Sequence, residues 1–375
     1  MKLEEFKAGT HKQQYQYKSF SPQPINKNWI WLDPSINVLL EKATQSLGEL
    51  NAFSIIVPNV DLFIKMHIVK EANTSSRIEG TKTKMDEAVM AKEDILPERR
   101  DDWQEVYNYI KAINQSIEEL ETLPLSSRLL CNTHKILMSS VRGEHKTPGE
   151  FRKSQNWIGG SGLSDAVFIP PGHDEINDLM SDLENFWHAP DIQVPHLIKI
   201  ALSHYQFETI HPFLDGNGRI GRLMITLYLV NFGLLKQPTL YLSDFFERNR
   251  ASYYDALSHG HDEDDIIHWI KFFLQAVIEI AGKSIDTFNK ILILKNETDI
   301  LSTKLRSRAD NVRRVIELFY QTPFLHVKDI SKSLSITDRS IRNIVNDLMK
   351  EGMIVETTGT SRNRLYLFKK YFSLF

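Results

Sequence analysis

The chain has 375 residues, 42% of them hydrophobic, which is enough for two or three domains with a sizeable core. Its formal net charge of −3 gives no sign, over the whole chain, of a nucleic-acid or membrane-surface protein. The single cysteine, Cys131, excludes an intramolecular disulfide and a cysteine-based zinc site, and no window is apolar enough to span a membrane. We therefore expect a soluble cytoplasmic protein without a membrane partner.

The charge is unevenly distributed along the chain. Residues 304–375 contain 14 Lys and Arg against 7 Asp and Glu, whereas residues 1–303 contain 31 against 41. A basic end on an acidic body predicts separate modules with separate partners.

The first third of the chain is predicted to be mainly helical after an extended lead-in of about 33 residues that packs onto the body. One helix shows a buried stripe at three- and four-residue steps, at Leu62, Met66, Val69 and Ala72. A second helix repeats this spacing at Trp103, Val106, Ile110, Ile113 and Ile117. A third follows over residues 126–140.

Residues 147–176 interrupt the helices. This segment contains five glycines and three prolines, and it has β-prone pieces at 156–158 and 166–169. It predicts an exposed β-hairpin within a helical domain. Helices resume over 174–188 and again from Pro195, which is suited to a first helical position. Further helical patterns continue to about residue 294.

The C-terminal block has a different layout. Three short helical patterns, at 311–320, 326–334 and 337–352, precede two alternating stretches around Gly359, which predicts a winged helix-turn-helix. The third helix has Thr337 as its N-cap and turns Ile341, Val345 and Leu348 inward. Its other face leaves Arg339, Ser340, Arg342 and Asn343 available for a DNA major groove, while Arg362 and Arg364 can reach phosphates. The alternative is a protein-docking or dimerising domain with a solvated basic face.

The densest polar stretch is HPFLDGNGRIGR, residues 211–222. Gly216 and Gly218 permit positive φ and close approach by a ligand, and a helix begins directly after them. The unpaired amides at that helix start predict an anion site suited to phosphate. Arg219 and Arg222, three residues apart, share one face of the helix and can reach further phosphate oxygens.

The remaining residues of this stretch can supply chemistry. Asp215 is a hard oxygen ligand suited to Mg²⁺, and His211 is a natural general base for a hydroxyl that attacks phosphorus. Asn217 can hold a phosphate oxygen through its side-chain amide. Together they indicate a metal-assisted phosphoryl or nucleotidyl transferase. The alternative is a helix corner with a buried histidine and capping side chains.

This stretch resembles the signature of the Fic (filamentation induced by cAMP) family, His-Pro-Phe-x-Asp-Gly-Asn-Gly-Arg-x-x-Arg, and matches every fixed position. The resemblance implies a helical core whose members mostly transfer AMP from ATP to a protein hydroxyl. It makes His211 the base and Asp215 the Mg²⁺ ligand. Kinase relatives carry Lys at the position of Gly218, and phosphocholine-transferring relatives carry Ala at that of Gly216, so adenylylation is favoured.

Further site residues follow from the same resemblance. Gly216, Asn217 and Gly218 form the anion hole for the α- and β-phosphates, Arg219 holds the β/γ end, and Arg222 positions the γ-phosphate. The predicted hairpin resembles the family's flap, with Phe168, Ile169, Pro170 and Pro171 along the nucleotide entrance. Positions where relatives contact nucleotide align with Gln206, Asn249, Tyr253 and Tyr254. His204 is interpreted as a packed core histidine rather than a metal ligand.

A second match lies upstream, where SSRIEG, residues 75–80, resembles the family's inhibitory motif. Extending the apolar stripe by helical steps reaches Ser76 and then Glu79, which places a carboxylate on the inward face. Such a carboxylate needs a cationic partner, and we expect this partner to be Arg222. Gly80 suits a helix C-terminus. The alternative is an exposed glutamate on a frayed helix end.

The sequence thus predicts a mainly α fold, a helical Fic core with a β-hairpin flap and a small C-terminal winged helix-turn-helix. Its parts are a helical region at 1–122 with an inhibitory helix at about 62–80, the catalytic core at 123–281, a linker helix at 282–309 and the winged helix at 310–375. We expect an adenylyltransferase, autoinhibited by Glu79, that uses ATP and Mg²⁺ on a target protein. Self-modification, a homodimer and duplex DNA as a partner are left open. The alternatives are a phosphodiesterase that removes AMP at the same site and a nucleotide-sensing DNA-binding regulator.

Overall fold

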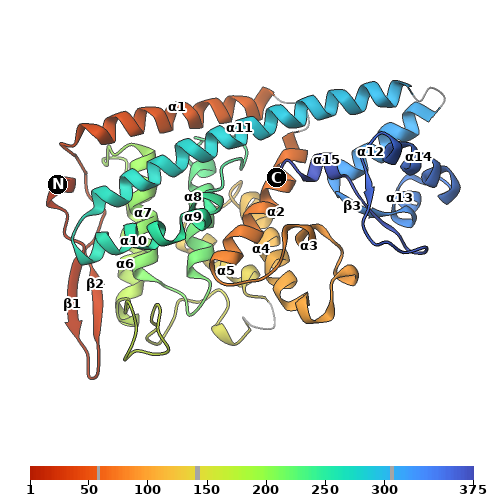
Figure 1. Cartoon of the computed structure of the whole chain (residues 1–375). Coiled ribbons are helices and arrows are strands. Elements are labelled where there is room, and N and C mark those ends of the chain that lie inside the picture. The colour runs from red at the N-terminus through yellow and green to blue at the C-terminus, as the bar shows by residue number, and fades with distance from the viewer. Residues whose placement is uncertain (57–59, 140–143, 305–307) are drawn as a thin grey trace.

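The protein is mainly helical, and its helices form one elongated body with a small mixed module at one end (Figure 1). This computed structural model describes residues 1–56, 60–139, 144–304 and 308–375. The fold class predicted from the sequence is confirmed for the helical core and its small antiparallel sheet. Among the described residues, no helix combines the length and apolarity that crossing a bilayer requires.

The N-terminal segment packs onto the body, as expected, but it also forms a hairpin that the sequence did not reveal. A 3₁₀ turn at Leu3–Glu5 precedes β1 (Gly9–Gln13) and β2 (Lys18–Pro22), which pair antiparallel with Gly9 opposite Pro22. Most β1 side chains are exposed, so the strand lacks the apolar alternation that marks a half-buried strand in a sequence. Five large apolar side chains of the segment are buried: Leu3, Phe6, Phe20, Ile25 and Trp29.

Helices α1 (Pro34–Ile56), α2 (Val60–Ile78), α3 (Met85–Val89) and α4 (Arg100–Glu119) form the next part of the body. Short 3₁₀ turns at Lys92–Asp94 and Pro97–Arg99 join α3 to α4. On the predicted α2 stripe, Met66 and Ala72 are buried and Val69 is half-buried, while the side chain of Leu62 lies outside the described residues. Phe63, Ile64 and Ile68 are buried as well, so α2 is covered over a wider face than its stripe indicated.

The centre of the body is built from α5 (Ser127–Leu137), α6 (Ile176–His188), α7 (His196–Ile210) and α8 (Asn217–Asn231). Helices α9 (Ser243–Arg248) and α10 (Arg250–Asp262) follow, and 3₁₀ turns lie at Glu144–Lys146 and His173–Glu175. Nearly every side chain of α7 and α8 is buried, which makes the turn between them a rigid place for a site. Pro195, predicted at the first helical position, is the N-cap of α7, so the helix begins one residue later, at His196.

Helix α11 (Ile266–Lys304) runs parallel to α1, with Lys271 near its start paired to Asp33 at the start of α1, and then continues toward the C-terminal module (Figure 1). It is continuous across residues 281 and 282, where the sequence predicted a boundary between the core and a linker helix. The physical reason is that its buried stripe does not stop at that boundary but continues through Ala281, Ser284, Phe288 and Ile291. Residues 305–307 of the predicted linker lie outside the described residues.

The C-terminal module, residues 309–375, contains α12 (Ala309–Gln321), α13 (Val327–Leu334), α14 (Asp338–Lys350) and α15 (Lys369–Phe372). Strands β3 (Phe324–His326), β4 (Val355–Glu356) and β5 (Leu365–Leu367) form an antiparallel sheet in the order β3-β5-β4. The sequence missed β3, because its three residues merge into the helical pattern that follows. That the C-terminal module is a winged helix-turn-helix stays a prediction.

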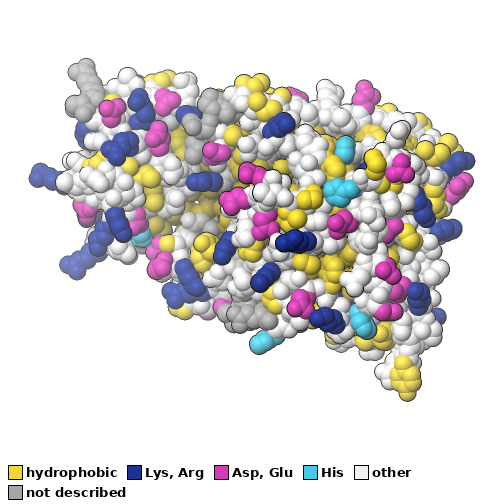
Figure 2. All heavy atoms as spheres, turned by 180° about the vertical axis from the view of Figure 1, so that it is seen from behind, with side chains coloured by type: hydrophobic (Ala, Val, Ile, Leu, Met, Phe, Trp, Pro, Cys, Tyr) yellow, Lys and Arg dark blue, Asp and Glu magenta, His cyan; other side chains and the backbone are white. Residues whose placement is uncertain are grey.

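Details of α14 agree with the sequence. The side chain of Thr337 caps the helix by accepting a hydrogen bond from the Ser340 amide, and Ile341, Val345 and Leu348 are fully buried. The opposite face leaves Arg339, Ser340, Arg342 and Asn343 exposed, and Arg362 and Arg364 are exposed too. Figure 2 shows Lys and Arg side chains projecting from this end of the molecule, at the left of the view.

The end of the C-terminal module packs against α2. The ring of Phe375 lies 5.3 Å from that of His67 and 6.4 Å from that of Phe63, and Phe63 stacks on Phe288 of α11. In addition, His326 Nε2 lies 3.3 Å from the carboxylate of Asp94. The first half of α2 is therefore held between α11 and the C-terminal module.

Candidate active site

A cavity of about 600 Å³ opens beside the turn that joins α7 to α8. Its walls come from the end of α2, the segment at 157–168, the turn itself and α10, and they include Glu79, Phe168, His211, Gly218, Arg222 and Tyr253. Residues that are far apart in the sequence, Glu79 and the 211–222 stretch, thus meet in one place.

The turn at residues 211–218, which we call the phosphate turn, has a backbone that few residues tolerate. His211 has φ 50° and ψ 60°, and Gly216 has φ 77°, so both lie in the left-handed region. Arg152 stabilises this shape, because its buried guanidinium donates to the carbonyl oxygens of His211 (2.9 Å) and Pro171 (2.6 Å). The same side chain thus ties the phosphate turn to the segment before α6.

Three further side chains bind two more carbonyl groups of the phosphate turn. The amide nitrogen of Asn156 donates to Phe213 O at 2.9 Å, and that of Asn217 donates to the same oxygen at 2.8 Å. His134 lies 3.0 Å from Asp215 O through Nε2 and stacks on the Phe213 ring. Because Nδ1 of His134 accepts from the Gly149 amide, Nε2 is the donor. The carbonyl groups of His211, Phe213 and Asp215 are therefore bound within the protein.

The amide groups at the start of α8 are left for a ligand. The first amides of an α-helix have no partner within the helix, and those of Asn217, Gly218 and Arg219 are in this position. With the helix dipole they form a site for an anion. The side-chain amide of Asn217, expected to hold a phosphate, instead donates to and accepts from the backbone of Phe213. Asn217 can therefore offer its backbone amide but not its side chain.

The imidazole of His211 is oriented by its own helix. Its Nδ1 lies 3.2 Å from the carbonyl oxygen of Glu208, which can only accept, so the proton is on Nδ1 and Nε2 carries the lone pair. Burial lowers the pKa of His211 to about 4, partly offset by the Glu208 carbonyl. At neutral pH the imidazole is thus uncharged and able to accept a proton.

Arg222 is almost completely buried and is held by the end of α2. Its Nη2 lies 2.7 Å from Glu79 Oε1 and 2.9 Å from Ser75 O, and its Nε donates to Ser75 Oγ at 2.9 Å. Burial alone would raise the pKa of Glu79, but the charge and hydrogen bond of Arg222 hold it below its ordinary value. The expected ion pair between Glu79 and Arg222 is present.

Glu79 lies one residue beyond the end of α2 rather than on the inward face of the helix. The helix ends at Ile78, and Gly80 follows with φ 100°. The side chain of Glu79 is 36% exposed, toward the cavity, so it is not packed among apolar groups. A Cβ at Gly218 would collide with Oε1 of Glu79, which shows how tightly the carboxylate is set against the start of α8.

Asp215 faces the cavity, whereas the side chain of Arg219 does not. Asp215 lines the cavity, and its Oδ1 accepts from the Gly216 amide at 2.6 Å. Arg219 points to the other side of α8, where its guanidinium lies 3.7 Å from Glu105, Asp215 and the sulfur of Met138. The structure thus brings Asp215 and Arg222 to the cavity but not the guanidinium of Arg219.

Asp215 is compatible with Mg²⁺ that arrives with a nucleotide. Within the described parts of the chain, no group of three or more His, Cys, Asp and Glu side chains could hold a metal ion by itself. Mg²⁺ is commonly bound by one or two carboxylates together with substrate phosphates, so a single carboxylate beside an anion site fits this mode.

The other predicted residues divide between the cavity and its surroundings. Tyr253, Tyr254 and Phe168 line the cavity, whereas Gln206 donates to Gln23 O and Asn249 donates to Phe245 O. The other flap residues, Ile169, Pro170 and Pro171, follow Phe168 outside the lining, and the flap pairing is one antiparallel bridge between Ile158 and Phe168. His204 is fully buried between Gly221 O and Tyr253 OH, which confirms its interpretation as a core residue.

The sequence analysis missed several side chains that shape the site. Arg152, Asn156 and His134 act on the backbone of the phosphate turn from 55 to 81 residues away, and no local pattern points to such contacts. Arg250 was missed as well, although it lines the cavity with its guanidinium over the Tyr254 ring. Arg152 stands in a glycine-rich loop, but its burial, which marks it as important, cannot be read from the sequence.

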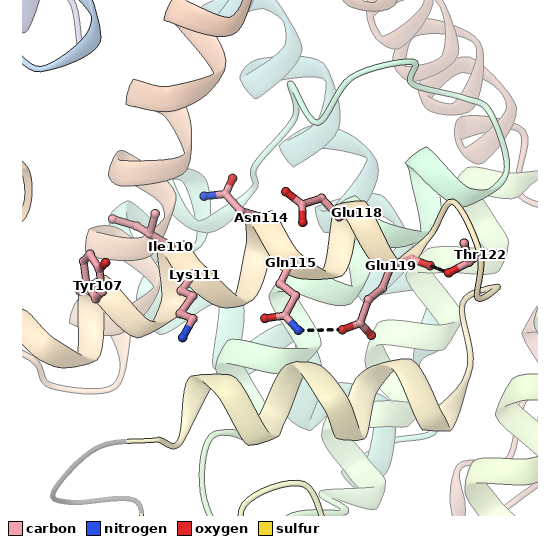
Figure 3. Close-up of a pocket in the computed structure, with 8 residues that line it drawn as sticks. All are labelled: Tyr107, Ile110, Lys111, Asn114, Gln115, Glu118, Glu119 and Thr122. Atoms are coloured by element: carbon pink, nitrogen blue, oxygen red, sulfur yellow. Dashed lines mark hydrogen bonds between the residues drawn. The ribbon is translucent and has the colours of Figure 1, made fainter.

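A second hollow of about 720 Å³ lies along α4 (Figure 3). It is lined by side chains of one helix and its C-terminal end, and Gln115 donates to Glu119 there. None of the predicted site residues reaches it. Volume therefore does not distinguish the two hollows, whereas the chemistry of the phosphate turn does.

The chain is similar to known proteins over its body. Residues 38–118 match the family model described as Fic/DOC family N-terminal, and residues 124–229 match that of the Fic/DOC family. A protein adenylyltransferase Fic from Drosophila erecta is 28% identical over 180 residues, 48% of this chain and 32% of that one. One from Aedes aegypti is 30% identical over 141 residues, 37% of this chain and 25% of that one. The chain thus spans about a third or less of these relatives.

A solved structure shares the fold over most of the chain. The crystal structure of a Fic family protein from Desulfovibrio desulfuricans G20 superposes with a TM-score of 0.56 at 22% sequence identity, covering 91% of this chain and 98% of that chain. At this level of identity the similarity concerns the fold alone.

The role of Asn217 can be tested by Asn217→Ala. The buried amide of Phe213 would lose its acceptor, so the free energy of unfolding should fall by about 1–3 kcal/mol, measured by urea denaturation. ATP binding should weaken with it. The control, Asn343→Ala on the exposed face of α14, should stay within about 0.5 kcal/mol. A loss of ATP binding at unchanged stability would instead indicate a direct phosphate contact of the side chain.

Proposed function

Because the chain belongs to the Fic/DOC family, we propose that it transfers AMP from ATP to a Ser, Thr or Tyr hydroxyl of a target protein. The observation that carries this proposal is the cavity, which combines an uncharged imidazole, a helix start with free amides and a buried arginine. Relatives named protein adenylyltransferase Fic support the same reaction class.

In this reaction His211 is the general base. Its bare Nε2 takes the proton of the target hydroxyl as the oxygen attacks the α-phosphorus, and pyrophosphate leaves. The Glu208 carbonyl keeps the ring in the required tautomer. General-base catalysis needs the uncharged imidazole, and the lowered pKa of His211 provides it at neutral pH.

The phosphates bind at the start of α8. The amides of Gly218 and its neighbours donate hydrogen bonds to the oxygens of the α- and β-phosphates. They are oriented before the substrate arrives, because carbonyl groups of the phosphate turn are bound elsewhere. Asp215 would hold Mg²⁺, which neutralises phosphate charge when bound. Arg222 is the cavity residue that would bind the terminal phosphate. The rings of Tyr253 and Tyr254 can stack on the adenine base of the nucleotide.

The same geometry supports autoinhibition by Glu79. A carboxylate on Arg222 competes with the γ-phosphate for the same donors. ATP can still enter, but its phosphates are then misplaced for in-line attack, and small misplacements are costly in rate. The flap segment near Ile158 and Phe168 offers main-chain groups to an extended target segment.

The first prediction concerns the base. His211→Ala should abolish transfer while ATP still binds, with a loss of roughly 10²–10⁴-fold or more, measured with labelled ATP and cell lysate. The control, His268→Ala, changes an exposed histidine of α11 and should leave labelling intact. Transfer at the wild-type rate in the His211 variant would rule out this mechanism.

The second prediction concerns inhibition. Glu79→Gly should raise labelling of the target or of the protein itself well above wild type, because it frees Arg222 for the γ-phosphate. Arg222→Ala should not, since it also removes the phosphate partner. Glu247→Ala breaks the ion pair of Glu247 with Arg77 of the same α2 turn, and it serves as the control with unchanged labelling. If Glu79→Gly labels no more than wild type with ATP binding intact, Glu79 has a structural or hydrolytic role.

The C-terminal module is proposed to bind duplex DNA through the exposed Arg339, Arg342 and Asn343 of α14. Residues 304–375 carry twice as many basic as acidic side chains, so the complex should weaken steeply with salt. Gel retardation of genomic fragments at low salt should detect it, and Arg342→Ala should weaken it. No retardation of any fragment would favour protein docking at this surface.

A further inference from the structure

Glu208 is a carboxyl group in the cavity wall that the proposed reaction does not use. It belongs to α7, one turn before His211, and its side chain is 12% exposed. Its Oε1 is buried and, among the described residues, has no hydrogen-bond partner. Because a buried polar atom without a partner is costly, this oxygen calls for a functional explanation.

The groups around Glu208 leave its carboxyl facing the start of α8. On α7, His204 Nε2 lies 3.9 Å from Oε1, but that nitrogen accepts from Tyr253 OH at 2.9 Å and so offers no proton. On α8, the residue in contact is Gly221, where a Cβ would collide with Oε1. The missing side chain at position 221 thus makes room for the carboxyl, and Glu208 and Arg222 line the same cavity.

Arg222 at present turns away from Glu208. Every hydrogen bond that its guanidinium makes within the described residues goes to the end of α2, to Ser75 and Glu79. Burial raises the pKa of Glu208 to about 8, against the effect of Arg222, and the charge of Glu79 raises it further. While Glu79 is paired, Glu208 therefore keeps its proton at neutral pH and does not compete for Arg222.

We propose that Glu208 is a positioning residue that takes over Arg222 when Glu79 leaves it, and that it then aims the guanidinium at the terminal phosphate of the nucleotide. This inference rests on the proposed function. Once Glu79 is gone, the charge that opposed ionisation of Glu208 is gone as well, and a buried arginine without a counterion would be unfavourable. The five donors of a guanidinium can serve a carboxylate and a phosphate at the same time.

The test is equilibrium binding of ATP and of AMP, without any target protein, to four proteins: wild type, Glu79→Gly, Glu208→Ala and the double variant. In the Glu79→Gly background, Glu208→Ala should weaken ATP about tenfold, the loss of one charge-assisted hydrogen bond, and should leave AMP within about twofold. With Glu79 present it should change neither nucleotide, because Glu79 then holds Arg222. The two substitutions should therefore be coupled for ATP only.

Glu208→Gln separates positioning from packing. The glutamine keeps the size of the side chain and an acceptor oxygen. In the Glu79→Gly background, Glu208→Gln should therefore bind ATP more tightly than Glu208→Ala does. It also keeps the proposal testable if Glu208→Ala does not fold. Equal weakening of ATP and AMP, or an ATP loss that is the same with and without Glu79, would overturn the proposal. These readouts do not involve transfer, so absent labelling would count against the proposed function and not against the role of Glu208.

Discussion

The site depends on the burial of one guanidinium. Arg222 lies on the first turns of α8, is 3% exposed and needs an anionic partner within the body of the protein. Burial opposes its charge, but the carboxylate of Glu79 raises its pKa above the ordinary value. Which anion occupies Arg222 therefore defines the state of the cavity. In the proposed function, the carboxylate of Glu79 and the terminal phosphate of a nucleotide compete for the Nη2 donor that Glu79 now holds.

The second constraint is the backbone of the phosphate turn, which the motif residues alone do not fix. Arg152, Asn156, His134 and the side chain of Asn217 bind its carbonyl groups, and the amides at the start of α8 are left facing the cavity. Such a site needs no reorganisation when phosphate arrives, which is the condition for strong electrostatic stabilisation. The short motif in the sequence is thus the visible part of a larger hydrogen-bonded unit.

The sequence predicted what local patterns encode. Helical periodicity located α2, α4 and α14, the Thr337 cap was correct, and the pairing of Glu79 with Arg222 followed from the need of a carboxylate for a cation. Most long-range contacts were not predictable, which explains why Arg152 was missed. The Asn217 side chain was misassigned for a different reason, because it is occupied by the backbone of Phe213, four residues away. The β1–β2 hairpin carries a mostly exposed β1, and the unbroken α11 crosses a predicted boundary where no residue stops a helix. In the β1–β2 hairpin, tertiary packing and not local preference decided the outcome.

The placement of Glu79 suggests how little must move to free Arg222. A shift of α2 as a rigid body would uncover Phe63, Met66 and Ile68 and separate the helix from Phe288 and Phe375, at about 1.5–3 kcal/mol for each large apolar side chain. Unwinding the last turn would expose the buried Ile78. Turning the side chain of Glu79 disrupts only its ion pair, because the residue lies beyond the helix end and faces the cavity. The least costly release is therefore local, and α2 can remain anchored to α11 and the C-terminal module while the nucleotide displaces a single carboxylate.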